Sequence, residues 1–178
     1  MVIEKNILDL NQAEFKQFAD LNYAAFGDAE SIDDQIILEK CREGKLNCIT
    51  FFDDEDLLAS VVYMLSETVA YYLFVVVADK YRNQGYGSKI LKYLAKKYSD
   101  RQQVIEIESL SEKNSPNYKE RISRCNFYLR NGYHLTKCQV IIRGVLLDVM
   151  CTGELLDKAG YAQLLEAEKE FIEPIILL

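Results

Sequence analysis

The sequence has one histidine, His134, and none of its five cysteines belongs to a Cys-x-x-Cys pair. An odd number of scattered cysteines argues against a disulfide framework and against a zinc site, so we expect free thiols that pack as small hydrophobes and no metal. Free thiols suit a reducing compartment, which favours a cytoplasmic protein. A catalytic cysteine such as Cys125 would need a histidine partner, and only His134 is available. We expect His134 to be structural.

Long apolar runs are also missing. The first ten residues lack the apolar core of a signal peptide, and no run approaches the roughly 18 residues that cross a bilayer. No membrane contact is therefore expected. The apolar end of the chain, residues 171–178, is short and is interrupted by Pro174. We expect it to pack against the domain or against a partner subunit, which makes a homodimer plausible.

Positive charge is in the minority. The chain has 21 Lys and Arg against 28 Asp and Glu, a net charge of -7. An acidic surface repels phosphate backbones, so nucleic acid is not an expected partner, whereas a basic or amine-bearing ligand fits. With 178 residues, 49% hydrophobic and 28% charged, the chain is expected to form a single globular domain over residues 1–178.

Hydrophobic periodicity predicts a mixed α/β domain without internal repeats. The run from Val69 to Ala78 is continuously apolar, which is typical of a central strand. Arg143-Gly144 separates two apolar runs and predicts a hairpin. Strands are expected over residues 2–8, 48–52, 57–65, 69–78, 104–108, 133–142 and 145–150, and helices over 11–26, 32–42, 88–98, 120–130 and 157–171.

The most informative segment follows the strand that ends at Ala78. Its residues, Arg82-Asn83-Gln84-Gly85-Tyr86-Gly87, lead into a helix. Glycines let backbone N–H groups approach a ligand, and a helix N-terminus adds unpaired donors and partial positive charge. The loop therefore suits a pyrophosphate. It lacks the Lys-Ser/Thr of a P-loop, and Ile90 stands where a dinucleotide fingerprint needs its third glycine. A plain strand–turn–helix is the alternative.

Arg82-x-x-Gly85-x-Gly87, after an apolar strand, resembles the pyrophosphate-binding motif of the GNAT superfamily of N-acetyltransferases. The resemblance implies the GNAT fold: a central mixed, mostly antiparallel sheet flanked by helices. It also implies acetyl-CoA as acyl donor. Asp79 stands where the family often has proline. The cofactor-binding residues implied are Phe74, Val75, Val76, Val77, Arg82, Asn83, Gln84, Gly85, Tyr86, Gly87 and Ser88.

A second match to this family lies downstream, in the segment from Phe127 to Tyr133. Tyr128 falls on the tyrosine that often protonates the departing thiolate of coenzyme A, a step that a nearby phenol assists. The alternative is a buried aromatic residue on a helix. Arg121 stands where many members carry an asparagine that contacts the cofactor. Arg121 could instead meet a phosphate or be a solvated helix charge.

The acceptor side offers several candidates. Amine acylation needs a group that takes the proton of the attacking amine. Glu106 and Glu108 alternate with Ile105 and Ile107 along one strand, so both carboxylates share a face and could bind a cationic acceptor or act as base. The alternative is a solvent-exposed polar face. Tyr72 is another acceptor-pocket candidate. The resemblance adds a border of acidic and aromatic residues: Phe26, Asp28, Glu30, Asp33 and Asp34.

These observations predict an acyl-CoA-dependent N-acetyltransferase that moves an acetyl group directly to a primary amine of a small molecule or peptide. Backbone N–H groups near Val76 would stabilise the negative charge that develops on the acetyl oxygen. Two alternatives stay open: a non-catalytic acyl-CoA-binding or regulatory module on the same fold, and an unrelated α/β domain whose loop binds another phosphate. The sequence leaves the acceptor unidentified.

Overall fold

The computed structural model describes residues 2–30, 32–172 and 175–177. Pro174, on which the expectation for the apolar end of the chain depends, lies outside these residues, as do the side chains of Asp28 and Glu30. The chain divides into two compact units. The first comprises Met1–Met64 and Tyr72–Ile90, and the second comprises Leu65–Tyr71 and Leu91–Leu178. The single domain over residues 1–178 stays a prediction.

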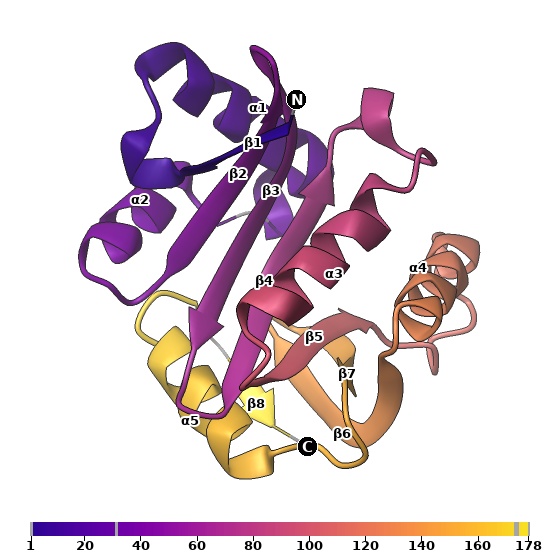
Figure 1. The fold of residues 1–178 in the computed structure, drawn as a ribbon. Coiled ribbons are helices and arrows are strands. Elements are labelled where there is room, and N and C mark those ends of the chain that lie inside the picture. Colours follow the sequence, from indigo (N-terminus) through magenta and orange to yellow (C-terminus); the bar gives the residue numbers. More distant parts are fainter. Residues whose placement is uncertain (1, 31, 173–174, 178) are drawn as a thin grey trace. The chain divides into compact units, whose positions relative to one another are not determined.

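The strands of the first unit form an antiparallel meander (Figure 1). They are β1 (Val2–Asn6), β2 (Asn47–Asp53) and β3 (Asp56–Leu65), and β4 (Val69–Val77) follows in the order β1-β2-β3-β4. The turn between β2 and β3 is acidic, and Asp54 in it takes the positive φ of 54° that such a tight turn requires. β2 and β3 are almost wholly buried, which explains their continuous apolar sequences.

The helices of the first unit begin at well-defined caps. α1 (Gln12–Glu30) opens on a capping box in which Asn11 Oδ1 accepts from Glu14 N and Glu14 Oε2 accepts from Asn11 N, both at 3.0 Å. Gly27, with φ of 62°, kinks this helix. α2 (Asp34–Arg42) packs against β2. The strand predicted over residues 2–8 was too long, because Asn6 caps the short 3-10 helix η1 (Ile7–Asp9).

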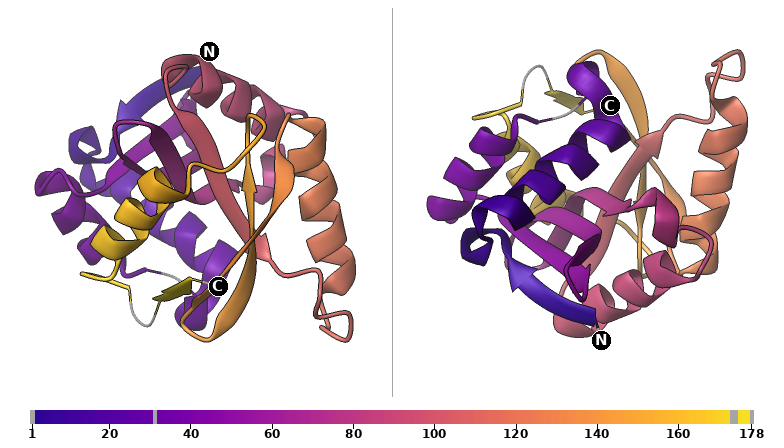
Figure 2. Two further views of the ribbon diagram at one scale, coloured as in Figure 1. Left: turned by 90° about the horizontal axis from the view of Figure 1, so that it is seen from below. Right: turned by 90° about the horizontal axis from the view of Figure 1, so that it is seen from above.

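The second unit contains the start of β4 and four further strands, in the order β4-β5-β7-β6-β8. The four are β5 (Gln102–Glu108), β6 (His134–Ile142), β7 (Val145–Cys151) and β8 (Ile175–Leu177). β6 and β7 form the predicted hairpin, because Arg143 and Gly144 both take positive φ. Figure 2 shows β5 and this hairpin side by side. The sheet is mostly antiparallel and partly parallel, as the fold prediction requires.

Three helices complete the chain: α3 (Tyr86–Lys97), which contributes to both units, α4 (Tyr118–Arg130) and α5 (Lys158–Glu168). A second 3-10 helix, η2 (Asp79–Tyr81), precedes α3. α5 ends three residues before the predicted boundary. Its buried residues are Gly160, Tyr161, Leu164, Leu165 and Glu168, so an acidic residue occupies one position of an otherwise apolar stripe.

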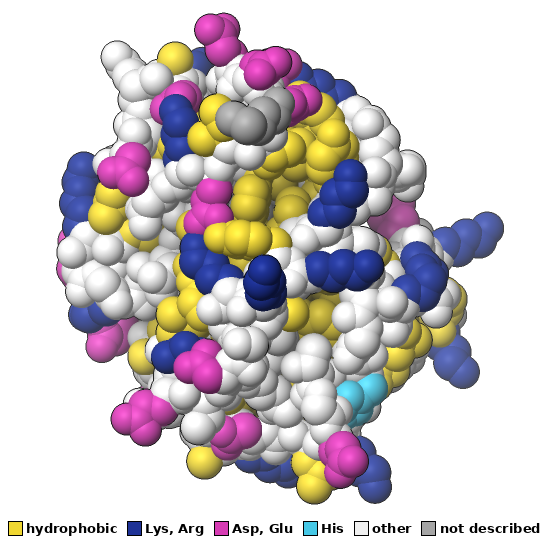
Figure 3. All heavy atoms as spheres, in the orientation of Figure 1, with side chains coloured by type: hydrophobic (Ala, Val, Ile, Leu, Met, Phe, Trp, Pro, Cys, Tyr) yellow, Lys and Arg dark blue, Asp and Glu magenta, His cyan; other side chains and the backbone are white. Residues whose placement is uncertain are grey.

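Across the described ranges, none of the helices combines the length and the apolar character that crossing a membrane demands. The face shown in Figure 3 carries basic side chains as well as acidic ones, although the net charge is -7. Basic groups therefore remain available to an anionic ligand in an acidic chain.

Candidate functional site

The loop between β4 and α3, within the first unit, has the geometry of an anion site. Asn83 and Gly85 take positive φ values of 60° and 81°, and α3 begins at Tyr86, two residues earlier than predicted. The first helical hydrogen bond joins Lys89 N to Gly85 O at 3.1 Å. The N–H groups of the preceding turn therefore have no partner within the helix and carry its partial positive charge.

Gly85 is required in this loop for two reasons. Its φ of 81° is strained for any residue with a Cβ atom, and the space where a Cβ would lie is open to 4 Å. A ligand oxygen can therefore approach the backbone closely. The residues fit the pyrophosphate of coenzyme A, because backbone donors at a helix N-terminus bind such an anion without a metal-type ligand set.

The polar side chains of the loop shape it. Arg82 donates from Nε to Val77 O at 3.1 Å and pairs with Asp79 at 2.9 Å. Gln84 donates to Lys80 O at 2.7 Å. Arg82 thus uses part of its hydrogen-bonding capacity within the loop. A guanidinium has five N–H donors, however, and the side chain of Arg82 is 53% exposed. These contacts leave the backbone amides as the principal donors toward a ligand.

β4 changes character along its length. Residues 69–72 are buried, whereas Leu73, Phe74, Val75 and Val77 are only partly buried. The Phe74 ring packs on Phe26 of α1 with centroids 4.4 Å apart. The partly exposed half of the strand is the segment that the resemblance assigns to the pantetheine arm. Backbone groups in such a segment can be reached by an extended ligand.

The acids predicted beside the acceptor have structural contacts. Asp33 caps α2 by accepting from Gln35 N at 2.7 Å, and Asp34 accepts from Asn22 Nδ2 at 2.7 Å. Burial raises the pKa of Asp34, although the hydrogen bond from Asn22 opposes this shift. Tyr72 is fully buried, with its ring 6.0 Å from that of Tyr63.

Tyr128 lies on α4 in the second unit and is 6% exposed. Its ring packs edge-on against Phe127 and Tyr133 at centroid distances of 5.1 and 5.5 Å. Burial raises the pKa of Tyr128 to about 12, although the charge of Arg124 opposes the shift. The phenol therefore keeps its proton at neutral pH, as a proton donor must.

Glu106 and Glu108, predicted as equivalent, have different surroundings. Both glutamates lie on β5 and are partly buried. The isoleucines that alternate with them, Ile105 and Ile107, are buried, as the alternating sequence predicts. Glu106 accepts hydrogen bonds from the hydroxyls of Tyr71, at 2.8 Å, and Tyr161. Burial raises the pKa of Glu106 to about 7, against the two hydrogen bonds. A carboxylate with such a pKa can exchange a proton near neutrality.

Glu108 instead belongs to an ionic cluster with the start of α4. It pairs with Arg124 at 2.6 Å and Arg121 at 3.2 Å and accepts from Asn117 at 2.8 Å. Burial opposes the shift, but Asn117 and the two arginines hold the pKa of Glu108 below its usual value. Glu108 is thus a weak base.

Arg121 is buried and committed to the protein. Besides Glu108 it donates to Asn117 Oδ1 at 2.8 Å, Ser109 O at 3.0 Å and Glu112 at 2.7 Å. This arrangement contradicts the reading of Arg121 as a solvated helix charge. Its guanidinium orders the loop that precedes α4.

Sequence reasoning missed Tyr71, Tyr161 and Glu168. Tyr161 and Glu168 are seven residues apart, and with Leu164 and Leu165 they form one helical stripe. A glutamate at the last position of such a stripe is the signal that could have indicated a buried carboxyl group. Tyr71 could not be distinguished from its neighbour Tyr72 by sequence alone.

The remaining candidates have no reactive geometry. All five cysteines are free and buried, and burial raises the pKa of Cys125. His134 Nε2 lies 3.6 Å from the buried thiol of Cys151. Within the described residues, no group of three or more His, Cys, Asp or Glu could hold a metal ion.

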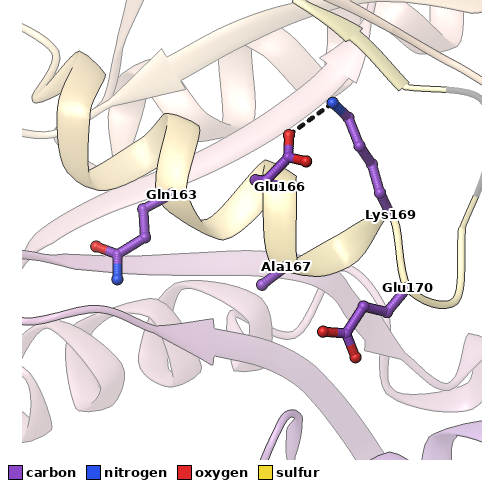
Figure 4. A pocket seen from close by; sticks show the side chains of 5 residues that line it. All are labelled: Gln163, Glu166, Ala167, Lys169 and Glu170. Carbon is purple, nitrogen blue, oxygen red and sulfur yellow. Dashed lines mark hydrogen bonds and ion pairs between the residues drawn. The ribbon is translucent and has the colours of Figure 1, made fainter.

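The exposed side of α5 lines a surface hollow of about 560 Å³ (Figure 4). An ion pair between Glu166 and Lys169 at 2.7 Å lies at this hollow, and the side chain of Glu166 is 75% exposed. Opposite charges that neutralise each other in solvent offer little for catalysis. This hollow is therefore a weak candidate for a catalytic site.

Comparison with known proteins supplies a family. The sequence profile of the acetyltransferase (GNAT) domain matches residues 36–135, which include both the loop and Tyr128. A comparison with curated proteins finds no match. Among solved structures, a Bacteroides thetaiotaomicron protein assigned to the GNAT acetyltransferases is similar with a TM-score of 0.75 and 20% identity, over 94% of this chain and 96% of that one.

Two further structures share the fold. An aminoglycoside 6'-N-acetyltransferase complexed with coenzyme A has a TM-score of 0.65 and 14% identity, over 84% of this chain and 96% of that one. The ribosomal-protein-S18-alanine N-acetyltransferase from Escherichia coli has a TM-score of 0.62 and 10% identity, over 88% and 96%. With its loop, its sheet and the profile match over more than half of its length, the chain belongs to the GNAT family of acetyltransferases, and so to the acyl-CoA-dependent N-acyltransferases.

Proposed function

We propose that this protein transfers an acetyl group from acetyl-CoA directly to a primary amine of a small molecule or peptide. The observation that carries the proposal is the loop from Arg82 to Ser88, in which positive φ at Gly85 and the start of α3 at Tyr86 present backbone amides to an anion. The profile match over residues 36–135 covers this loop. Two similar solved structures contain coenzyme A, which supports the same donor here.

The amides of Gln84, Gly85, Tyr86, Gly87 and Ser88 would hold the pyrophosphate, and the strand residues from Phe74 to Val77 would pair with the pantetheine arm. Acetyl-CoA supplies the acetyl thioester when it is bound. The chain's own task is then to orient this donor and to move two protons.

The first proton comes from the acceptor. An ammonium group cannot attack a thioester, so one N–H bond must break while the nitrogen keeps its electron pair. We assign this proton to Glu106, because its pKa of about 7 allows it to be ionised before the step and protonated after it. Glu108 is a poorer candidate, since Arg121 and Arg124 stabilise its charged form.

The second proton leaves the attacking nitrogen as the amide forms, and it replaces the proton that Tyr128, the proposed donor, gives to the departing sulfur. A thiol has a pKa of about 8.5, so complete transfer from a phenol of pKa about 12 is uphill by roughly 5 kcal/mol. Tyr128 is therefore expected to share its proton with the sulfur in the transition state and not to ionise for long. Its contribution should lie at the lower end of the usual range for acid catalysis.

Donor binding is tested by isothermal titration calorimetry of acetyl-CoA into the wild type and Gly85→Glu. The matched control is Gly144→Glu, which adds the same charge at a similar positive φ (82°) with equally open space. Saturable binding that Gly85→Glu abolishes and Gly144→Glu retains supports the loop as the site. Absence of binding to the wild type would overturn the proposal.

Transfer is tested by release of free thiol from acetyl-CoA over a panel of polyamines, aminoglycosides, amino acids and peptides. Acetylation of one class establishes the reaction. Tight binding of acetyl-CoA without transfer to any of them would favour a non-catalytic acyl-CoA-binding module instead.

A further inference from the structure

A pair of carboxyl groups, one partly buried and one fully buried, lies in the second unit. Glu106 of β5 and Glu168 of α5 both contact Tyr71 of β4, and Tyr161 contacts Glu106. Tyr71, Tyr161 and Glu168 are at most 1% exposed. The rings of Tyr71 and Tyr161 meet edge-on with centroids 5.5 Å apart, which fixes both hydroxyls toward the carboxyl groups. We call these four side chains the carboxyl-pair cluster.

Glu168 is the unusual member of this cluster. It occupies a position of the α5 stripe where an apolar side chain would be expected, and it is 1% exposed. Its Oε2 atom is buried and finds no hydrogen-bond partner among the described residues. A carboxylate in that position would carry an uncompensated buried charge, which costs far more than a neutral acid.

The hydrogen atoms of the cluster can be counted. Tyr71 has one hydroxyl hydrogen, and it is directed to Glu106 Oε2 at 2.8 Å. Glu168 is also hydrogen-bonded to Tyr71. A carboxylate only accepts, so the bond between Glu168 and Tyr71 requires a hydrogen on the carboxyl group of Glu168. The chain of donors then runs from Glu168 to Tyr71 to Glu106.

The electrostatic surroundings agree with this count. Burial, with repulsion by Glu106, raises the pKa of Glu168 to about 9, and the charge of Arg143 opposes the shift. A hydrogen bond donated by Tyr71 would also lower this pKa, but the hydroxyl hydrogen of Tyr71 is directed to Glu106. Cys138 of β6 is also near the cluster, and burial raises its pKa, although the charge of Lys158 opposes this shift. Between the two pKa values the cluster therefore holds one negative charge, and it lies on Glu106.

We propose that Glu168 is a positioning residue that stays protonated and, by donating to Tyr71, strengthens the hydrogen bond with which Tyr71 supports the charge on Glu106. This inference builds on the proposed role of Glu106 as base. When an acceptor ammonium gives its proton to Glu106, an N–H bond breaks, an O–H bond forms and the cluster becomes neutral. Glu168 thus leaves Glu106 as the only group of the pair that changes charge in the reaction.

The proton on Glu168 is tested by unfolding the protein in urea at pH 6, 7 and 8. A buried acid that holds its proton in the folded state binds one more proton folded than unfolded, so stability falls as pH rises between the unfolded and folded pKa values. Glu168→Gln cannot show this dependence. Relative to the wild type, its equilibrium constant for unfolding should fall tenfold for each pH unit. Glu166→Gln, on the exposed side of the same helix, is the control and should follow the wild type.

The link through Tyr71 is tested by a carbon-13 NMR titration of the Glu106 carboxyl group, identified by its loss in Glu106→Gln. Glu168→Gln keeps a donor for Tyr71, whereas Glu168→Leu does not. The Glu106 midpoint should stay near that of the wild type in Glu168→Gln and rise by on the order of half to one pH unit in Glu168→Leu.

Neither measurement requires an acceptor or acetyl-CoA, so both can succeed even if no amine is acetylated. Equal pH slopes for wild type and Glu168→Gln would overturn the protonated state of Glu168. Equal Glu106 midpoints in Glu168→Gln and Glu168→Leu would overturn its positioning role.

Discussion

Tyr71 donates a hydrogen bond of 2.8 Å from its hydroxyl to Oε2 of Glu106. This contact distinguishes Glu106 from Glu108, although the two glutamates occupy similar positions in the sequence. Glu106 gains neutral phenol donors, whereas Glu108, two residues further on β5, gains the positive charges of Arg121 and Arg124. A neutral partner leaves a buried carboxylate able to accept a proton near pH 7, and a cationic partner does not. The roles of base and structural anchor follow from this difference.

Glu106→Gln should lower turnover by about 10²- to 10⁴-fold, the usual contribution of a general base. In the wild type the ionised form of Glu106 is the active one, so kcat/KM should fall as pH drops through about 7. The residual activity of Glu106→Gln should lack this acid limb. Steady-state kinetics between pH 5.5 and 8.5 measure both effects, and an unchanged limb near pH 7 in the variant would remove Glu106 from the mechanism.

Glu108→Gln should reduce stability instead. The side chains of Glu108 and Arg121 are 13% and 9% exposed, and removing one partner of such a pair costs roughly 3 kcal/mol, the low end of the range for buried pairs. Because the folded pKa of Glu108 is lowered, its contribution is present above the unfolded pKa and is lost as pH falls through the folded value.

The difference between wild type and Glu108→Gln should therefore be large at pH 7 and small at pH 3, as measured by urea unfolding. Glu112→Gln is the matched control, because Glu112 pairs with the same Arg121 at 2.7 Å while its side chain is 49% exposed. A loss in Glu112→Gln as large as that in Glu108→Gln would contradict the importance of burial.

Tyr128→Phe should lower kcat by about 100-fold and leave the dissociation constant of acetyl-CoA within about twofold, because only a proton donor is removed. Tyr133→Phe provides the comparison, since its ring packs on Tyr128 at 5.5 Å and is buried as well. Stopped-time thiol release and calorimetry give the two constants. Equal turnover in Tyr128→Phe and the wild type would leave Tyr128 as a core aromatic residue.

Much of the fold could be predicted because local signals and tertiary contacts agree. Asn11 and Glu14 form the capping box that begins α1, and Arg143-Gly144 takes the two positive φ values of its hairpin. β8 was missed, because three residues carry too little periodicity for a strand. It forms only by pairing with β6 at the sheet edge.

Only the part of the candidate site that consists of backbone groups, the anion-binding loop, could be predicted from the sequence. Gly85 and the helix that follows indicate an anion-binding loop from sequence, since the required φ and the orphan amides are local properties. The carboxyl pair had one weak signal in the sequence, the place of Glu168 on the apolar stripe of α5. A glutamate near the end of a helix is ordinarily solvated, and only the folded structure shows that Glu168 is 1% exposed.

Gly160→Ala should destabilise the protein, although alanine is favoured over glycine in helices by about 1 kcal/mol. A Cβ at this position would lie 2.6 Å from Thr68 Oγ1, 2.8 Å from Asp157 Oδ2 and 2.9 Å from Val69 Cγ2. Asp157 cannot move away freely, because its Oδ1 atom accepts from Gly160 N at 3.0 Å and caps α5. Overpacking of this kind costs about 1–3 kcal/mol, which exceeds the gain in helix propensity.

The cause can be isolated by adding Thr68→Ala, which removes the atom nearest to the new Cβ. Urea unfolding should show that Gly160→Ala costs less in the Thr68→Ala background than alone, a coupling that independent sites would not give. Stabilisation by Gly160→Ala in the wild-type background would contradict the close approach of Gly160 to Thr68.

The close packing of Gly160 also matters for the carboxyl-pair cluster, because Tyr161 follows Gly160 directly and its hydroxyl donates to Glu106. A shift of α5 away from the β3–β4 turn should therefore also weaken the hydrogen bond from Tyr161 to Glu106, raise the pKa of Glu106 further, and appear as a higher midpoint for its carboxyl resonance.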